Sequence, residues 1–287
     1  MTDFAPPWTA TQIEGRPVTI VDFTLSGRRR TQWFLLSSDR HHDSIHGDPV
    51  MEKRHLDEAV RRGAGIIDNG DLFDAMQGYN DPRACKGALK KELDVTAYSD
   101  AMVDEAAKFY KPYAANFIQL NKGNHETAFG KRASTDLTKR LAKELGCICG
   151  HYAGFIGFRV RASGNKVTTL WAYYHHGPDK GGQVTKGVLS TARMAAYLAN
   201  VDVVLTGHSH DEWLMPVNRV KVTPDGDVVR CKQWYVRTPG YKDEWSIGDG
   251  WAVEKGMAPK GKGAVWMGVT VDNFMEFRPR LEFTLGG

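Results

Sequence analysis

Cysteine is scarce in this 287-residue chain, and long apolar runs are missing. Its four cysteines do not suit a disulfide framework, and Cys147 and Cys149 are one residue apart, unlike the two-residue spacing of zinc knuckles and redox pairs. No stretch approaches the roughly 18 uninterrupted apolar residues of a membrane span. The N-terminus also lacks the charged and then apolar layout of a signal peptide. We therefore expect a cytoplasmic protein with reduced thiols and no membrane partner.

A strong excess of charge of either sign is also missing. The chain has 38 Lys and Arg against 34 Asp and Glu, so its formal net charge is only +4. Spread over this length, that charge produces a weak field and does not by itself indicate nucleic-acid binding. The hydrophobic fraction of 41% and the charged fraction of 25% are those of a globular protein, which excludes intrinsic disorder.

Apolar runs alternate with segments of helical period along the chain, a pattern that predicts a layered α/β fold. We expect two early strands, at 18–25 and 33–38, to form a hairpin through a turn at Ser26-Gly27-Arg28. No linker or internal repeat divides the chain, so we expect one domain over residues 1–287. Its balanced charges predict that the segment at about 75–115 is a solvated helical insertion.

Short polar clusters follow five of the apolar runs. If these runs are strands of one core, their carboxyl ends can converge on one crevice, which is where open α/β sheets bind ligands. The clusters are Asp39-Arg40-His41, Gly70-Asp71-Leu72-Phe73-Asp74, Gly123-Asn124-His125-Glu126, His175-His176-Gly177 and Gly207-His208-Ser209-His210.

The residue types in these clusters favour a metal site. Asp39 and His41, like His208 and His210, are two residues apart, so in extended backbone both members of a pair project to the same side. Two Asp, one Asn and four His suit Mn, Fe, Zn or Ni. Because such a set is too large for one tetrahedral ion, we expect two divalent ions that share a bridge. Asp71 is the candidate bridge, since Gly70 before it lets the backbone approach closely.

Each cluster also has a simpler interpretation. Alone, an Asp-x-His is ordinary surface decoration, a Gly-Asp is a turn, and a Gly-Asn-His is a helix entry with Asn as the cap. The order of the five clusters, each behind an apolar run, favours the metal site over these separate explanations.

The five clusters resemble the motifs of the calcineurin-like metallophosphoesterase superfamily, which run Asp-x-His, Gly-Asp-x-x-Asp, Gly-Asn-His-Glu or Asp, His-Gly, and Gly-His-x-His. The segment Lys180-Gly181-Gly182, with Lys186, is similar to a phage- and prokaryote-type branch of the superfamily. The resemblance implies a four-layer α/β sandwich in which helices flank two mixed sheets, and a dinuclear centre.

The resemblance also implies a role for each residue. His125 would protonate the leaving oxygen without binding metal. One ion, Mn before Fe, Zn or Ni, would take Asp39, His41, Asp71 and His210, and the other would take Asp71, Asn124, His176 and His208.

Several residues next to these clusters have other expected roles. His175 and His176 are adjacent, and we choose His176 as the ligand because it directly precedes Gly177. Asp74 is expected to orient a ligand histidine or the Gly-Asp turn. Arg40 is a candidate for contact with substrate phosphate, although nothing in the sequence fixes its direction. His55 is expected at the surface.

The leading hypothesis is an enzyme that hydrolyses a phosphate ester through a hydroxide activated by the two ions. A phosphodiester such as nucleic acid or a nucleotide is favoured over a monoester. The alternatives are a phosphomonoesterase or protein phosphatase, and a phosphoesterase-like scaffold that binds a partner without catalysis. The oligomeric state is left open.

Overall fold

The computed structural model describes residues 5–28, 30–77, 81, 84, 86–162, 166–178, 182, 184–246, 248, 251–275 and 277–287. Lys180 and Gly181, which carry the resemblance to the phage- and prokaryote-type branch, lie outside these residues.

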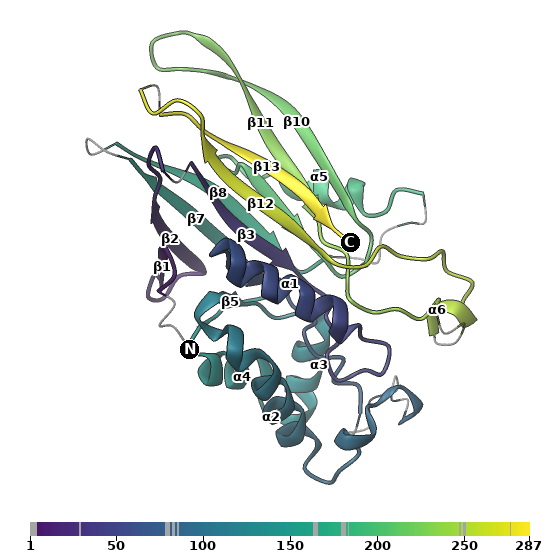
Figure 1. The fold of residues 1–287 in the computed structure, drawn as a ribbon. Helices are drawn as coiled ribbons and strands as arrows, with labels where there is room; N and C mark the ends of the chain where they lie inside the picture. Colours follow the sequence, from purple (N-terminus) through teal and green to yellow (C-terminus); the bar gives the residue numbers. More distant parts are fainter. Residues whose placement is uncertain are drawn as a thin grey trace.

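Two mixed sheets form the centre of the fold (Figure 1). The seven-stranded sheet has the order β1 (Trp8–Gln12), β2 (Val18–Thr24), β7 (Ala153–Arg161), β8 (Val167–His175), β9 (Val203–Thr206), β11 (Val228–Arg237) and β10 (Trp213–Val222). The six-stranded sheet has the order β13 (Pro279–Gly286), β12 (Ala264–Val271), β3 (Thr31–Ser37), β4 (Gly65–Asp68), β5 (Phe117–Leu120) and β6 (Ile148–Cys149).

Helices cover the outer faces of both sheets. On the six-stranded sheet they are α1 (Pro49–Arg62), α2 (Tyr98–Tyr110), α3 (Asn124–Ala133) and α4 (Leu137–Leu145), with short 3-10 turns η1 (Lys86–Ala88), η2 (Lys91–Leu93) and η3 (Lys111–Asn116). On the seven-stranded sheet lies α5 (Val188–Ala196), and a short helix, α6 (Trp251–Glu254), projects from a loop (Figure 1). The predicted four-layer α/β sandwich is therefore confirmed.

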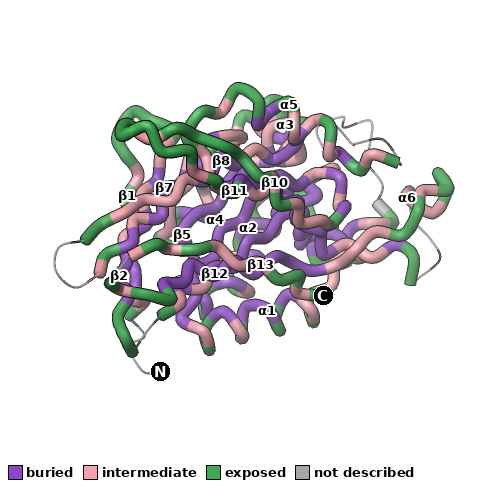
Figure 2. Tube along the Cα trace, turned by 90° about the horizontal axis from the view of Figure 1, so that it is seen from above, coloured by how far each residue is buried: buried purple, intermediate pink, exposed green. Residues whose placement is uncertain are grey.

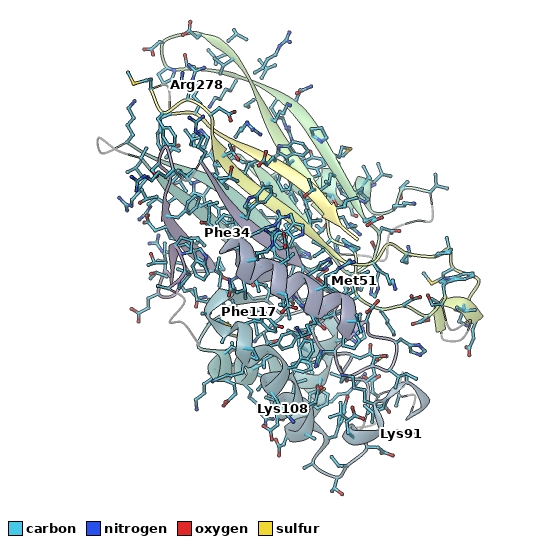
Figure 3. The ribbon with its side chains drawn as sticks, viewed as in Figure 1. Phe34, Met51, Lys91, Lys108, Phe117 and Arg278 are labelled. Carbon is cyan, nitrogen blue, oxygen red and sulfur yellow. The ribbon has the colours of Figure 1, made fainter. Side chains whose placement is uncertain are left out.

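The side chains of the inner strands alternate between two cores, because successive residues of a strand point to opposite faces. Phe34 packs between the two sheets, whereas its neighbour Leu35 packs against the helices. Phe34 and Phe117, which belong to these two different cores, are both labelled in Figure 3. With both faces covered, β4 and β12 are buried along their whole length, and Figure 2 shows a buried centre of the molecule.

The hairpin predicted for the first two strands is wrong. β2 pairs with β1 and, in parallel, with β7, whereas β3 lies in the other sheet between β12 and β4. The Ser26-Gly27-Arg28 segment therefore carries the chain from one sheet to the other. A local turn signal does not reveal which sheet the next strand joins.

The region at about 75–115 has a helix that is part of the core. Met102, Val103 and Ala106 of α2 are buried against α4 and the six-stranded sheet.

None of the described helices combines the length and apolar character that a membrane crossing needs.

Candidate metal centre

All five predicted clusters lie at or within three residues of the end of a strand. Three follow β3, β4 and β5, which are parallel neighbours in one sheet, and two follow β8 and β9, which are parallel neighbours in the other. Backbone hydrogen bonds join the loops, from Asp39 N to Gly70 O at 2.9 Å and from Gly207 N to His176 O at 2.7 Å. The site is thus built where the carboxyl ends of both sets of parallel strands meet.

Much of the predicted ligand set has left-handed backbone. The φ angles are 52° at Asp39, 46° at His41, 53° at Asp71, 72° at His208 and 55° at His210. Such angles are uncommon outside glycine and concentrate where function requires a particular side-chain direction. The extended backbone assumed for the two pairs of ligands is therefore wrong, although the pairs do converge.

Asp39, His41 and His210 form a first cluster, with ligand atoms within 4.8 Å of one another. His41 Nε2 lies 3.2 Å from His210 Nε2, and His210 Nε2 lies 3.4 Å from Asp39 Oδ1. Asp39 is fully buried, and nothing in the described part of the chain donates a hydrogen bond to its Oδ1. A buried carboxylate oxygen without a donor is costly, and a cation at this point would satisfy it.

Asp71, His176 and His208 form a second cluster of the same kind. His176 Nε2 lies 3.0 Å from Asp71 Oδ2 and 3.2 Å from Asn124 Oδ1. His176 Nδ1 donates to the Asn69 carbonyl at 2.7 Å, which leaves Nε2 as the nitrogen that faces the cluster.

The structure places the two adjacent histidines differently. His176 is fully buried and faces the second cluster, whereas the His175 ring lies against Tyr152 and Tyr173. His175 is the last residue of β8, so its side chain and that of His176 leave the strand in different directions.

Opposing charges keep the acidic ligands ionised. Burial raises the pKa of Asp71, but the histidines around it, His176 foremost, outweigh burial and hold this pKa well below its usual range. Burial lowers the pKa of His176, yet Asp71 raises it to about 10. Burial lowers the pKa of His210 to about 4. A cation that entered the second cluster would take the place of the proton on His176.

The residues present fit two divalent cations. Carboxylate, amide oxygen and imidazole are the donors that borderline divalent metals prefer, and two separate clusters of such donors lie in one site. Asp71 belongs to the second cluster, and its charge also acts on Asp39 and His41 of the first.

His125 lies at the start of α3, beside Asp71. Its Nδ1 donates to the Asp74 carbonyl at 2.5 Å, and its Nε2 lies 3.7 Å from Asp71 Oδ2. The Asp74 carboxylate contacts His41 Nδ1 at 2.7 Å. Asp74 therefore contacts His41 through its carboxylate and His125 through its backbone carbonyl.

Glu126 is a structural part of the site to which sequence reasoning assigned no role. Its Oε2 accepts the backbone N–H groups of Gly123 at 2.8 Å and Asp71 at 3.1 Å, and its Oε1 accepts that of Phe73 at 3.0 Å. Burial, followed by the charge of Asp71, raises its pKa to about 7. The sequence feature that could have identified Glu126 is its place as the fourth residue of the Gly-Asn-His-Glu cluster.

The Arg40 side chain is directed at two buried carboxylates. Its guanidinium is fully buried and pairs with Asp68 at 2.6 Å and with Glu52 at 2.5 Å, so the suggested contact with substrate phosphate is not made by this geometry. The expectation that His55 lies at the surface is wrong. Its side chain is only 3% exposed, and its Nδ1 lies 2.9 Å from the Tyr241 hydroxyl.

No protein-family model matches the chain, and no curated protein matches it. Solved structures do match it. A calcineurin-like phosphoesterase from Bacillus subtilis is 11% identical, with 90% of this chain and 91% of that chain covered and a TM-score of 0.42. A metallophosphoesterase from Sphaerobacter thermophilus is 10% identical, with 89% and 88% covered and a TM-score of 0.34. GAP50, the anchor in the inner membrane complex of Plasmodium, is 13% identical, with 90% and 85% covered and a TM-score of 0.38.

These matches have TM-scores below 0.5, so the function proposed below depends on the residues of the site alone. In its five motifs, and in the two-sheet architecture that brings those motifs together, the chain resembles the calcineurin-like metallophosphoesterases.

Proposed function

We propose that the protein is a metal-dependent phosphoesterase with a dinuclear centre. The observation that carries the proposal is the convergence of two donor clusters at the strand ends, one of Asp39, His41 and His210 and one of Asp71, His176 and His208, with Asn124 beside the second. One ion would be held by Asp39, His41, Asp71 and His210, and the other by Asp71, Asn124, His176 and His208. Bound divalent ions, manganese first among those that suit these donors, would lower the pKa of a water molecule and neutralise phosphoryl oxygens.

The protein's own contribution to bond cleavage is the proton of His125. Because Nδ1 donates to the Asp74 carbonyl, Nε2 is the nitrogen that faces the site, 3.7 Å from Asp71 Oδ2. In the imidazolium form, Nε2 can give a proton to the oxygen that leaves phosphorus. Asp74 keeps the ring in this orientation while it also holds His41.

A phosphodiester suits the charges around the site better than a monoester does. Arg40 is buried and pairs with Asp68 and Glu52, and Arg237 is buried and donates to Thr206 Oγ1 and Ser209 Oγ. Lys242 pairs with Glu244 at 3.1 Å and lies 3.7 Å from Asp74. A dianionic monoester gains most from additional cations that contact its terminal oxygens, and these cations are already engaged by the protein. A monoanionic diester, such as a nucleotide or nucleic acid, depends on them less.

The test is hydrolysis of bis-p-nitrophenyl phosphate and p-nitrophenyl phosphate by metal-free protein to which Mn²⁺ is returned. We expect Mn²⁺-dependent turnover that is faster with the diester. Faster turnover of the monoester would assign the protein to the phosphomonoesterases. If the protein bound Mn²⁺ and cleaved neither ester nor DNA, it would be a binding scaffold, and the proposed activity would be wrong.

A further inference from the structure

Arg40 stands between two of the proposed ligands and is fully buried. Asp39 and His41, on either side of it, both have left-handed backbone. The guanidinium lies over the rings of Tyr110 and Tyr241, at 5.5 Å and 5.1 Å from their centroids. A side chain of this size pointing into the core fixes the direction of its two neighbours, which therefore face the site.

The same guanidinium reaches the loop that carries Asp71. Arg40 Nε donates to Asp68 Oδ2 at 2.6 Å, and Asp68 Oδ1 accepts the backbone N–H of Gly70 at 3.2 Å. The two loops are also joined by their backbones, from His41 N to Asp71 O at 3.1 Å. Arg40 and Asp68 thus form a buried bridge between the loop that holds the first ligands and the loop that holds the shared one.

A second carboxylate, that of Glu52, contacts Arg40 but not the loop that carries Asp71. Glu52, on α1, accepts from Arg40 Nη1 at 2.5 Å and from the Tyr110 hydroxyl, and its Oε2 lies 3.4 Å from His42 Nδ1. Both carboxylates are buried partners of one cation, and only Asp68 connects it to the second ligand loop. Replacing Asp68 and replacing Glu52 can therefore be compared, since each substitution removes one carboxylate partner of Arg40.

We propose that Arg40, acting through Asp68, is a positioning residue that sets the spacing of the two ligand loops and thereby the affinity for metal. The inference rests on the proposed metal centre. Arg40 touches neither the ions nor the substrate, and its effect passes through the backbone of residues 39–41 and 68–71. Groups that orient metal ligands typically change metal affinity by about 10- to 100-fold when they are replaced.

The experiment compares Asp68→Asn with Glu52→Gln, since each replaces one buried carboxylate by its amide. Mn²⁺ binding to metal-free protein is measured by titration calorimetry, and unfolding of the metal-free protein is measured by thermal melts. We expect Asp68→Asn to weaken Mn²⁺ binding about tenfold or more, and Glu52→Gln to weaken it less than about threefold, even where the two melts fall by similar amounts. Equal effects on binding, or unchanged binding in Asp68→Asn, would overturn the inference.

Arg40→Lys supports the measurement if Asp68→Asn is too unstable to titrate. It keeps the buried positive charge but loses the planar group that bonds Asp68, Glu52 and Ser37 together. We expect weakened Mn²⁺ binding here as well, and binding equal to that of the unaltered protein would contradict the inference. The two proposals fail separately, because a chain that binds no Mn²⁺ before any substitution refutes the metal centre itself.

Discussion

Replacing the proposed proton donor, His125→Gln, should slow hydrolysis in a way that depends on the leaving group. His125 Nε2 faces the site at 3.7 Å from Asp71 Oδ2, with the side chain 13% exposed, so a proton on it is well placed to reach an oxygen that leaves phosphorus. Positioned acid catalysis contributes about 10²- to 10⁴-fold in rate, or about 3–5 kcal/mol of transition-state stabilisation. That loss should appear in full only where the departing oxygen is a strong base.

The assay therefore compares a p-nitrophenyl diester with an alkyl or nucleoside diester. Because p-nitrophenolate departs without a proton, we expect His125→Gln to lose less than about tenfold with the first substrate and about 10²-fold or more with the second. Metal content, measured on the same samples, should not change, since His125 is not a proposed ligand. An equal loss with both leaving groups, or full activity with both, would refute the role of His125 as the acid.

Three further predictions concern metal binding and stability. Asp71→Asn should greatly reduce the metal that remains after dialysis, because the shared carboxylate is lost from both ions; two retained ions per chain would contradict its bridging role. Removing the ions with a chelator should lower the melting temperature by about 5 °C or more, since ligand at 100 times its dissociation constant stabilises a protein by about 2.7 kcal/mol; an unchanged melt would argue against bound ions. Burial lowers the pKa of His55 to about 4, so its contribution to stability is complete above pH 6.5 and is lost as the pH falls towards 4. Between pH 6.5 and 4, the unfolding free energy of the His55→Gln protein should fall by up to about 3 kcal/mol less than that of the unaltered protein. If both proteins lose the same unfolding free energy over this range, His55 is not the group responsible.

The position of the candidate site could be predicted because the signal is local. Each cluster directly follows an apolar run, and a buried strand followed by Asp, Asn or His is visible in the sequence itself. The convergence of the clusters then depends only on the strands being parallel neighbours, as β3, β4 and β5 are in one sheet and β8 and β9 in the other.

The directions of side chains next to the ligands could not be predicted in the same way. Arg40 is fully buried, and its neighbours Asp39 and His41 adopt left-handed backbone, whereas sequence spacing assumes an extended chain. The partners of Arg40 are Glu52 and Asp68, which lie 12 and 28 residues away. The contacts of Glu126 could not be predicted for the same reason, because the N–H groups that it holds belong to two different loops.

The pairing of strands was the least predictable part of the fold. The turn at Ser26-Gly27-Arg28 is suited to a hairpin, yet β2 and β3 belong to different sheets. Because both strands bury a face in the core between the sheets, their apolar patterns are compatible with either arrangement.

Anomalous diffraction from crystals grown with Mn²⁺ tests the central claim most directly. We predict two peaks at about 3.5–4 Å from each other, with Asp71 between them. Asp39, His41 and His210 should surround one peak, and Asn124, His176 and His208 the other. A single peak, or Mn²⁺ bound away from these residues, would contradict the account.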